Sequence, residues 1–385
     1  MAKERNYAID FFRFLFSVGF VVGHMAIIMG RLPGRDAGGF TFALDTLAVF
    51  ICIAGFFMMR HYRKQEAAAK EQGLSPVTQA WSYFASRVRG LGPWFLLGNL
   101  SGFAALLYWN QTPPSQWFDA FLNHLGEFFG LMLTGFGYGC NIHGAYGEVT
   151  AEYNLVNGPL WFVSGLFICS FLLFYMIAKN EKRTVCVVVP IVSLLFYGSL
   201  YLTPEVTQPF WHHFLNIGEF KINVGLIDMF CNLGLGCLMY LGVEAMGKRE
   251  FSRPFYVFVT IVQAFLLLFI PFRTLAPTNV DWNPFSFGWG SAYLLALLFT
   301  FLLVLNKDGA TKFANRKFLG TLGALSMYIY ILHYPVVIFA SPIAYQSVPA
   351  YIGVVVVIVL IISVAAARID RKLQPWLKTA PWFKK

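Results

Sequence analysis

The stretch that decides the fold class is residues 9–29, IDFFRFLFSVGFVVGHMAIIM. It is mostly apolar and long enough for a helix to cross the hydrocarbon core of a bilayer, which takes about 20 residues. Nine similar runs follow, at 40–59, 91–109, 159–178, 185–202, 224–243, 255–272, 288–305, 319–340 and 350–367. Only 12% of the residues are charged, whereas soluble domains carry about 25%. We therefore predict an all-α, polytopic membrane helix bundle of about ten transmembrane helices, forming one domain over residues 1–385.

The Lys and Arg residues predict the orientation of the bundle, because cytoplasmic loops carry an excess of them. If the N-terminus is cytoplasmic and all ten runs cross, most of the 29 basic residues fall on the cytoplasmic side. The outside segments then hold only Arg31, Arg35, Lys221 and Arg273. We therefore predict that both termini are cytoplasmic. The net charge of +10 is accounted for by this topology, so we expect contact with a lipid bilayer and none with nucleic acid.

An eleventh, weaker run covers residues 118–136 and includes Asn123, His124 and Glu127. If it crossed the membrane, every later loop would change sides and the basic clusters would face outward. We therefore predict that 118–136 is re-entrant or interfacial within the outer segment 110–158. Irregular backbone is tolerated at membrane depth where it is buried in protein or lines a cavity.

The cysteines and histidines do not predict a metal site. Most of the six cysteines lie inside apolar runs, which excludes a disulfide or zinc framework. His124 with Glu127, and the pair His212 and His213, offer suitable ligand types. Their spacing gives no closed set of four ligands, so we expect no metal.

Polar residues form one stripe on the first predicted helix. Asp10 and Ser17 flank Arg13 on the same side, and His24 follows Arg13 by about three helical turns. Charged residues near the centre of a membrane helix are costly and usually functional. Two structural alternatives stay open: Arg13 snorkels to the interface and pairs with Asp10, and His24 bonds a neighbouring helix.

A second stripe follows on the run 319–340, where Ser326, Tyr330 and His333 have helical i, i+4, i+7 spacing and Pro335 comes just beyond. Counted from the cytoplasmic ends of their helices, His24 and His333 both lie about 21 to 22 Å deep, at a rise of 1.5 Å per residue. We therefore predict that the two histidines share one cavity, although a packing role for Tyr330 is an equal alternative.

These residues resemble the signatures of the acyltransferase-3 family of integral membrane acyltransferases. The opening Asp-Phe-Phe-Arg13 with His24 eleven residues after the arginine resembles that family's first helix. The segments 49–56, 157–162 and 326–335 resemble its Phe-Phe-x-x-Ser-Gly-Phe, Pro-Leu-Trp and Tyr-x-x-His-x-Pro segments, in family order. Ala54 departs from the family's usual serine, which puts any hydroxyl role there in doubt.

The resemblance implies an acyl-CoA-dependent O-acetyltransferase. Such enzymes move an acetyl or other short acyl group from cytoplasmic acyl-CoA to a hydroxyl of a cell-surface or exported carbohydrate or glycolipid. The donor acetyl-CoA is a substrate, and no permanently bound cofactor is expected. A location in the plasma membrane, the inner membrane of a bacterium, follows from the same resemblance.

The resemblance also implies roles for individual residues. His24 is the expected general base, with an acyl-imidazole as a variant, and Arg13 either holds a CoA phosphate or orients the site through Asp10. Expected substrate-binding residues are Asp10, Ser17, Arg60, Arg63, Arg87, Arg89, Trp161, Ser326, Tyr330 and His333. The four arginines from Arg60 to Arg89 suit phosphates, but they also obey the positive-inside rule without any ligand.

A proton-coupled transporter of a sugar or another small molecule is the alternative function. Ten helices with buried Arg and His residues also describe such carriers. Transporters often show paired inverted repeats with broken helices at matching positions, and this sequence shows no such pair. The sequence does not indicate the oligomeric state.

Overall fold

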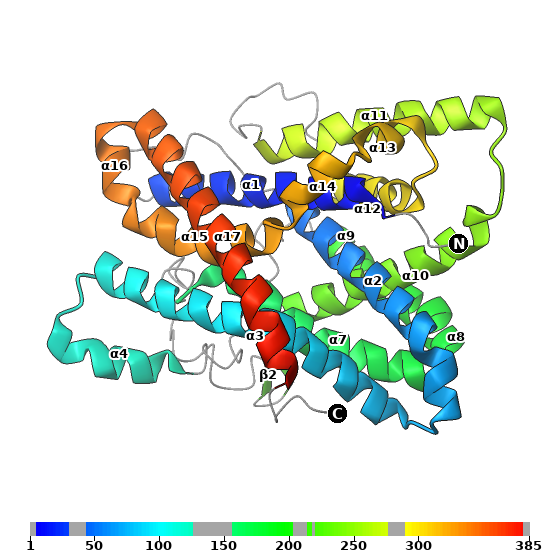
Figure 1. Cartoon of the computed structure of the whole chain (residues 1–385), viewed down its shortest axis with the longest axis horizontal. Coiled ribbons are helices and arrows are strands. Elements are labelled where there is room, and N and C mark those ends of the chain that lie inside the picture. Colours follow the sequence, from blue (N-terminus) through cyan, green and yellow to red (C-terminus); the bar gives the residue numbers. More distant parts are fainter. Residues whose placement is uncertain are drawn as a thin grey trace. The chain divides into compact units, whose positions relative to one another are not determined.

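The computed structural model describes residues 5–30, 44–125, 156–202, 214–217, 220–275 and 289–379. The long helices are α1 (Tyr7–Gly30), α2 (Leu44–Glu71), α3 (Pro76–Trp109), α7 (Trp161–Lys179), α9 (Val189–Leu202), α10 (Val224–Gly247), α11 (Arg253–Leu275), α12 (Trp289–Leu305), α15 (Ser326–Phe339) and α17 (Val348–Thr379) (Figure 1). The short helices are α4 (Trp117–Asn123), α8 (Glu181–Arg183), α13 (Gly309–Ala314), α14 (Lys317–Gly323) and α16 (Ser341–Gln346), with the helical turns η1 (Pro114–Gln116), η3 (Gly158–Leu160) and η4 (Thr184–Val188). Strands β1 (Phe214–Ile217) and β2 (Phe220–Asn223) form one antiparallel pair, with Phe214 opposite Asn223.

The predicted all-α membrane fold class is confirmed. Every predicted apolar run overlaps a helix, and six helical segments within the described ranges are long and apolar enough to cross a bilayer. The bent pair α14 and α15, at 43°, adds a seventh if it is one span. The apolar parts of α11 and α12 are shorter. The count of ten crossings therefore stays a prediction.

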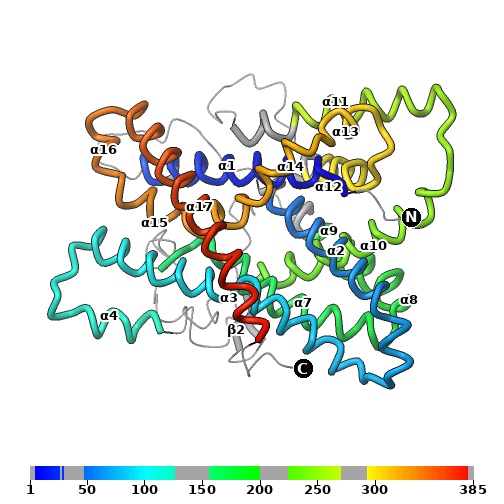
Figure 2. The backbone as a smooth tube through the Cα atoms, in the orientation of Figure 1, coloured from blue at the N-terminus to red at the C-terminus, as the bar shows by residue number. Residues whose placement is uncertain are grey.

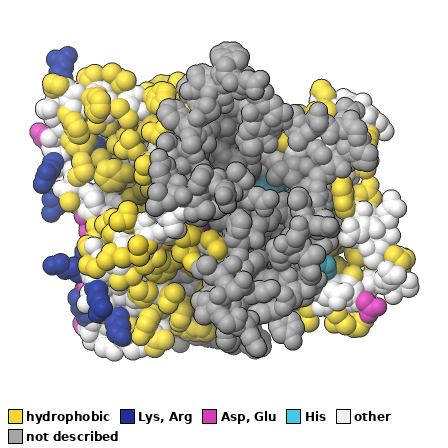
Figure 3. Space-filling model, turned by 180° about the vertical axis from the view of Figure 1, so that it is seen from behind, with side chains coloured by type: hydrophobic (Ala, Val, Ile, Leu, Met, Phe, Trp, Pro, Cys, Tyr) yellow, Lys and Arg dark blue, Asp and Glu magenta, His cyan; other side chains and the backbone are white. Residues whose placement is uncertain are grey.

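Large apolar side chains are exposed on several of these helices. Leu194 on α9 and Leu268 on α11 are each 75% exposed, and Phe318 on α14 is 70% exposed. Figure 3 shows broad hydrophobic surface in yellow, with the Lys and Arg side chains in dark blue at its margin. Such exposure would be costly in water and is what lipid-facing helices require.

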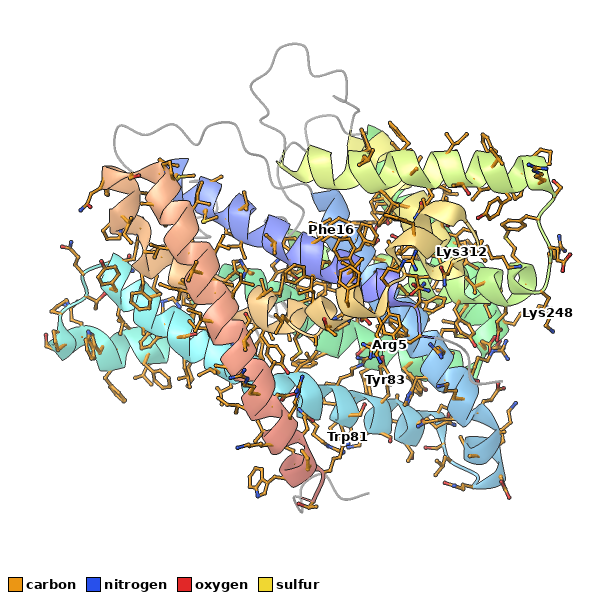
Figure 4. All side chains as sticks on the ribbon, turned by 45° about the horizontal axis from the view of Figure 1, so that its top comes forward. Arg5, Phe16, Trp81, Tyr83, Lys248 and Lys312 are labelled. Carbon is orange, nitrogen blue, oxygen red and sulfur yellow. The ribbon has the colours of Figure 1, made fainter. Side chains whose placement is uncertain are left out.

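The chain divides into two compact units. Unit 1 consists of residues 1–64 and 232–329, and unit 2 of residues 65–231 and 330–385. In unit 1, Phe12 and Phe16 of α1 pack edge-on against Phe299 of α12, with ring centroids 5.4 and 5.9 Å apart. Phe16, labelled in Figure 4, lies among the side chains of this core. Buried aromatic residues thus fix α1, the helix that carries the first polar stripe.

Two glycines bring α2 and α10 into backbone contact within unit 1. A Cβ atom at Gly55 would lie 2.0 Å from the carbonyl oxygen of Leu233, and one at Gly236 would lie 2.0 Å from that of Cys52. Any larger residue would force the two helices apart. Glycine allows this close approach, as small residues commonly do between membrane helices.

Unit 2 is built on the pair α3 and α7. The rings of Tyr83 and Phe174 stack at 4.7 Å, and those of Phe95 and Phe167 meet at 6.0 Å. Helix α17 joins this pair through Trp94, whose indole Nε1 donates to the carboxylate of Asp370 at 2.7 Å.

Helix α4 turns back along α3, as the cyan segments of Figure 2 show. Phe121 and His124 place their rings 5.9 and 6.4 Å from the ring of Phe103, which lies well inside α3. Most of the predicted segment 118–136 lies outside the described residues, so its character remains a prediction.

Candidate functional site

The first polar group of α1 is an ion pair. The carboxylate of Asp10 accepts hydrogen bonds from Nε and Nη2 of Arg5 at 2.9 and 2.7 Å. The Asp10 side chain is only 16% exposed, and charge-assisted bonds of this length are strong. In the sequence, Arg5 is one of the basic residues that the positive-inside rule places on the cytoplasmic side. Arg5 precedes the helix and is five residues from Asp10, so helical spacing does not flag the pair.

Helix α14 packs closely on the beginning of α1. A Cβ atom at Gly320 would lie 2.3 Å from a ring carbon of Tyr7, and one at Gly323 would lie 2.4 Å from Cβ of Asp10. Both positions therefore require glycine. This contact holds the Asp10 end of the stripe in a fixed place within unit 1.

Ser17 connects α1 to the beginning of α15. Its hydroxyl is fully buried and lies 2.8 Å from the carbonyl oxygen of Arg13 and 3.0 Å from that of Ser326. The Ser326 hydroxyl in turn donates to the carbonyl of Gly323 at 2.9 Å. The structure thus gives Ser17 and Ser326 a helix-joining role beside Arg13, and brings together these two predicted residues from distant parts of the sequence.

The bonding of His24 fixes its tautomer. Its Nδ1 lies 2.8 Å from the carbonyl oxygen of Phe20, one turn earlier on α1. A carbonyl oxygen only accepts hydrogen bonds, so Nδ1 carries the hydrogen and, in the neutral ring, Nε2 holds the lone pair. The side chain is half-buried. His24 is therefore an oriented imidazole whose Nε2 has the electronic form that a general base needs.

The basic residues of α2 lie beside acidic and phenolic groups of α10 in unit 1. Arg63 Nη2 is 3.9 Å from Glu244 Oε2, and both side chains are partly exposed. Arg60 is half-buried and interacts electrostatically with Tyr240 of α10. Part of the positive charge available for a phosphate is thus offset by Glu244.

The basic residues of α3 belong to unit 2. Arg87 donates from Nε and Nη2 to the Tyr83 hydroxyl at 2.9 and 2.5 Å, and its guanidinium lies 4.9 Å from the Tyr83 ring centroid. Arg89 is half-buried, and its carbonyl accepts from Gln374 of α17 at 3.5 Å. Tyr83 therefore orients the Arg87 guanidinium through two hydrogen bonds and a ring contact.

Three predicted residues meet around η3 in unit 2. The Tyr330 hydroxyl donates to the carbonyl of Pro159 at 2.6 Å, and its ring lies 5.3 Å from that of Phe162. Trp161 begins α7 and is 6% exposed. His333 is fully buried, and its Nδ1 lies 2.8 Å from the Tyr330 carbonyl oxygen. Trp161, Tyr330 and His333 are therefore parts of one packed junction.

Asn157 joins α3 and α15 at this junction. It was not among the predicted site residues. Its amide Nδ2 donates to the carbonyls of Gly98 on α3 and Ile331 on α15, at 3.0 and 3.3 Å. A Cβ atom at Gly98 would meet Ile331 at 2.8 Å, and one at Gly102 would meet the Val156 carbonyl at 2.2 Å. The spacing of Gly98 and Gly102, a Gly-x-x-x-Gly pattern in an apolar helix, was the available signal.

The predicted site residues fall in both units. Unit 1 contains Asp10, Arg13, Ser17, His24, Arg60, Arg63 and Ser326, and unit 2 contains Arg87, Arg89, Trp161, Tyr330 and His333. The cavity expected to be shared by His24 and His333 remains a prediction. Among the residues that the structure describes, no three His, Cys, Asp or Glu side chains gather as metal ligands. Glu127, His212 and His213 lie outside those residues.

Comparison with known proteins gives one match. The model of a type-3 acyltransferase family, described as an acyltransferase domain, matches residues 6–368. No curated protein and no solved structure matches the chain.

Proposed function

The chain belongs to the acyltransferase-3 family of membrane acyltransferases, and we propose that it moves an acetyl or other short acyl group from acyl-CoA to a carbohydrate hydroxyl. The family covers nearly the whole chain, and the fold is that of a multi-pass membrane protein. We further propose that the donor enters from the cytoplasm and that the acceptor is a cell-surface or exported glycan or glycolipid. The plasma membrane, in a bacterium the inner membrane, is the location that this role requires.

The observation that carries the proposal is the orientation of His24. With Nδ1–H held by the Phe20 carbonyl, Nε2 takes the proton from the acceptor hydroxyl. The hydroxyl oxygen then attacks the thioester carbonyl carbon, the carbon–sulfur bond breaks, and the CoA sulfur leaves with the electron pair. The proton on Nε2 passes to this thiolate, so the histidine returns to its starting form and the products are an ester and free CoA.

Arginines support donor binding in this scheme. Arg13 lies about 16 Å before His24 along α1, on the side toward the cytoplasm, at 1.5 Å per residue. A guanidinium there suits a phosphate of the donor, while the acyl end of the long pantetheine arm lies deeper. Arg87, oriented by Tyr83, is a second candidate for phosphate contact. Arg63 is a weaker one because Glu244 faces it.

The test combines binding and turnover. Purified full-length protein in lipid nanodiscs is titrated with acetyl-CoA, and cells with and without the protein are compared by mass spectrometry of their surface and exported glycans. We expect saturable acetyl-CoA binding and acetyl groups on a glycan only in cells with the protein. The absence of acetyl-CoA binding by well-folded protein would refute the donor, and an unchanged glycan profile would refute the carbohydrate acceptor.

A further inference from the structure

The amide group of Asn157 has a defined orientation. Two main-chain carbonyls, those of Gly98 and Ile331, lie within hydrogen-bond distance of one end of the amide. Carbonyls only accept, so this end must be the NH₂ group, and the amide oxygen must point the other way. The orientation of the amide thus follows from its two partners.

The amide oxygen of Asn157 is buried and has no hydrogen-bond partner. The residue is 0% exposed, and Oδ1 is one of the few buried side-chain atoms without a partner in the part of the chain that the structure describes. Ser164, about two helical turns later, has a second such atom in its buried hydroxyl. An unsatisfied buried acceptor costs about 1–3 kcal/mol, so its retention calls for a donor that completes it.

Asn157 lies in irregular backbone that contacts an apolar helix. It precedes η3 with φ −150° and ψ 86°, outside the helical region, and it contacts α3 at Gly98, within the apolar run 91–109. Such backbone is tolerated in a bilayer only where protein covers it or where it lines a cavity. At Asn157, which is 0% exposed, protein covers the irregular backbone, so its polar groups must find partners inside the protein or on a bound molecule.

The same helix connects Asn157 to the basic residues of unit 2. Gly98 follows Arg89 by nine residues and Arg87 by eleven, which is about 14 and 16 Å along α3. A donor whose phosphates contact these arginines would extend its pantetheine arm along α3 toward Gly98. This arm is thin and carries two amide N–H groups, whereas a sugar ring would need a much wider opening beside a side chain that is fully buried.

We propose that Asn157 is a donor-binding residue whose amide oxygen accepts a hydrogen bond from an amide N–H of the pantetheine arm of acyl-CoA. The inference rests on the proposed function, since it assumes acyl-CoA as the donor. It adds a recognition site for the arm itself, separate from the phosphates and from the reacting thioester. Opening of the packing next to Asn157 accompanies binding, and the unmet oxygen is then satisfied.

The experiment pairs a change in the ligand with a change in the protein. Binding of acetyl-CoA and of two analogues, in which one or the other pantetheine amide is replaced by an ester, is measured on wild-type protein, Asn157→Ala and Asn99→Ala in nanodiscs. Asn99 is the matched control, because it is equally buried on α3 but its Nδ2 bonds Phe95 of the same helix. An ester keeps the shape of the arm and removes one N–H donor.

We expect wild-type protein and Asn99→Ala to bind one of the ester analogues about tenfold more weakly than acetyl-CoA. Asn157→Ala should bind that analogue and acetyl-CoA with equal affinity. Equal discrimination in Asn157→Ala would overturn the inference. If Asn157→Ala does not fold, the measurements on wild-type protein decide alone. Equal affinity for all three ligands overturns the inference, and a tenfold lower affinity for one ester analogue supports it. If wild-type protein binds acetyl-CoA in no form, the proposed function itself fails.

Discussion

The two histidines of the candidate site make the same local bond in different surroundings. His24 on α1 and His333 on α15 each have Nδ1 at 2.8 Å from a main-chain carbonyl oxygen one turn earlier. His24 is half-buried, whereas His333 has no exposed surface and is packed against Tyr330. Both rings therefore have the tautomer of a base, but of the two only His24 keeps part of its surface exposed. Tautomer alone does not identify a catalytic histidine.

The largest expected effect separates the two rings. If His24 is the general base, as proposed, His24→Ala should lower acyl transfer by about 10²–10⁴-fold while acetyl-CoA affinity stays within a few-fold of wild type. Turnover with labelled acetyl-CoA and equilibrium binding on the same preparation measure both quantities. Near-normal turnover of His24→Ala, together with an inactive His333→Ala, would mean that His333 and not His24 is the base.

The next effect concerns the geometry of the first helix. Arg13→Lys keeps the positive charge but loses the planar fork of the guanidinium. If orientation matters, transfer should fall by about a hundredfold, as small misplacements of a substrate do. Arg183→Lys on α8, an exposed residue with no predicted role in the site, is the control. Equal activity of both variants would mean that Arg13 contributes charge alone.

His333→Ala should have a smaller effect. The change removes the hydrogen bond to the Tyr330 carbonyl and loosens the junction at Asn157, so we expect about a tenfold loss of transfer and a lower melting temperature. We expect His24→Ala, in contrast, to leave the melting temperature unchanged, because His24 is not part of that junction. If both histidine variants kept full activity, neither ring would be a base, and transport would become the better explanation.

The smallest effect is expected at Arg87, the partly exposed candidate for phosphate contact in unit 2. Arg87→Ala should weaken acetyl-CoA binding by about two- to fivefold and reduce the dependence of that binding on salt, because partly exposed charges contribute little individually. Titrations at low and high salt measure both. Tyr83→Phe should reproduce part of the loss by releasing the Arg87 guanidinium. Unchanged affinity in both variants would leave Arg87 a purely topological role.

Helix positions could be predicted from the sequence, and most details of the site could not. Apolar runs indicate helices because a bilayer demands internal backbone hydrogen bonds, and this determined the fold class. The spacing of Arg13 and His24 placed them on one helix side for the same reason. The Arg5–Asp10 pair and the amide of Asn157 depend on contacts outside helical periodicity. Gly55 and Gly236 are 181 positions apart in the chain, so their role as contact points between α2 and α10 could not be predicted from the sequence.

The hydroxyl of Ser17 has one hydrogen and two carbonyl oxygens within reach, one on its own helix and one at the beginning of α15. If the Ser326 carbonyl moves out of reach, the hydroxyl can donate to the Arg13 carbonyl alone, so its donor is not left unsatisfied. Separation at this point therefore costs packing but no buried polar penalty. The Ser17 hydrogen bond thus helps to align the first polar stripe with Ser326, while its loss would leave no unsatisfied donor behind.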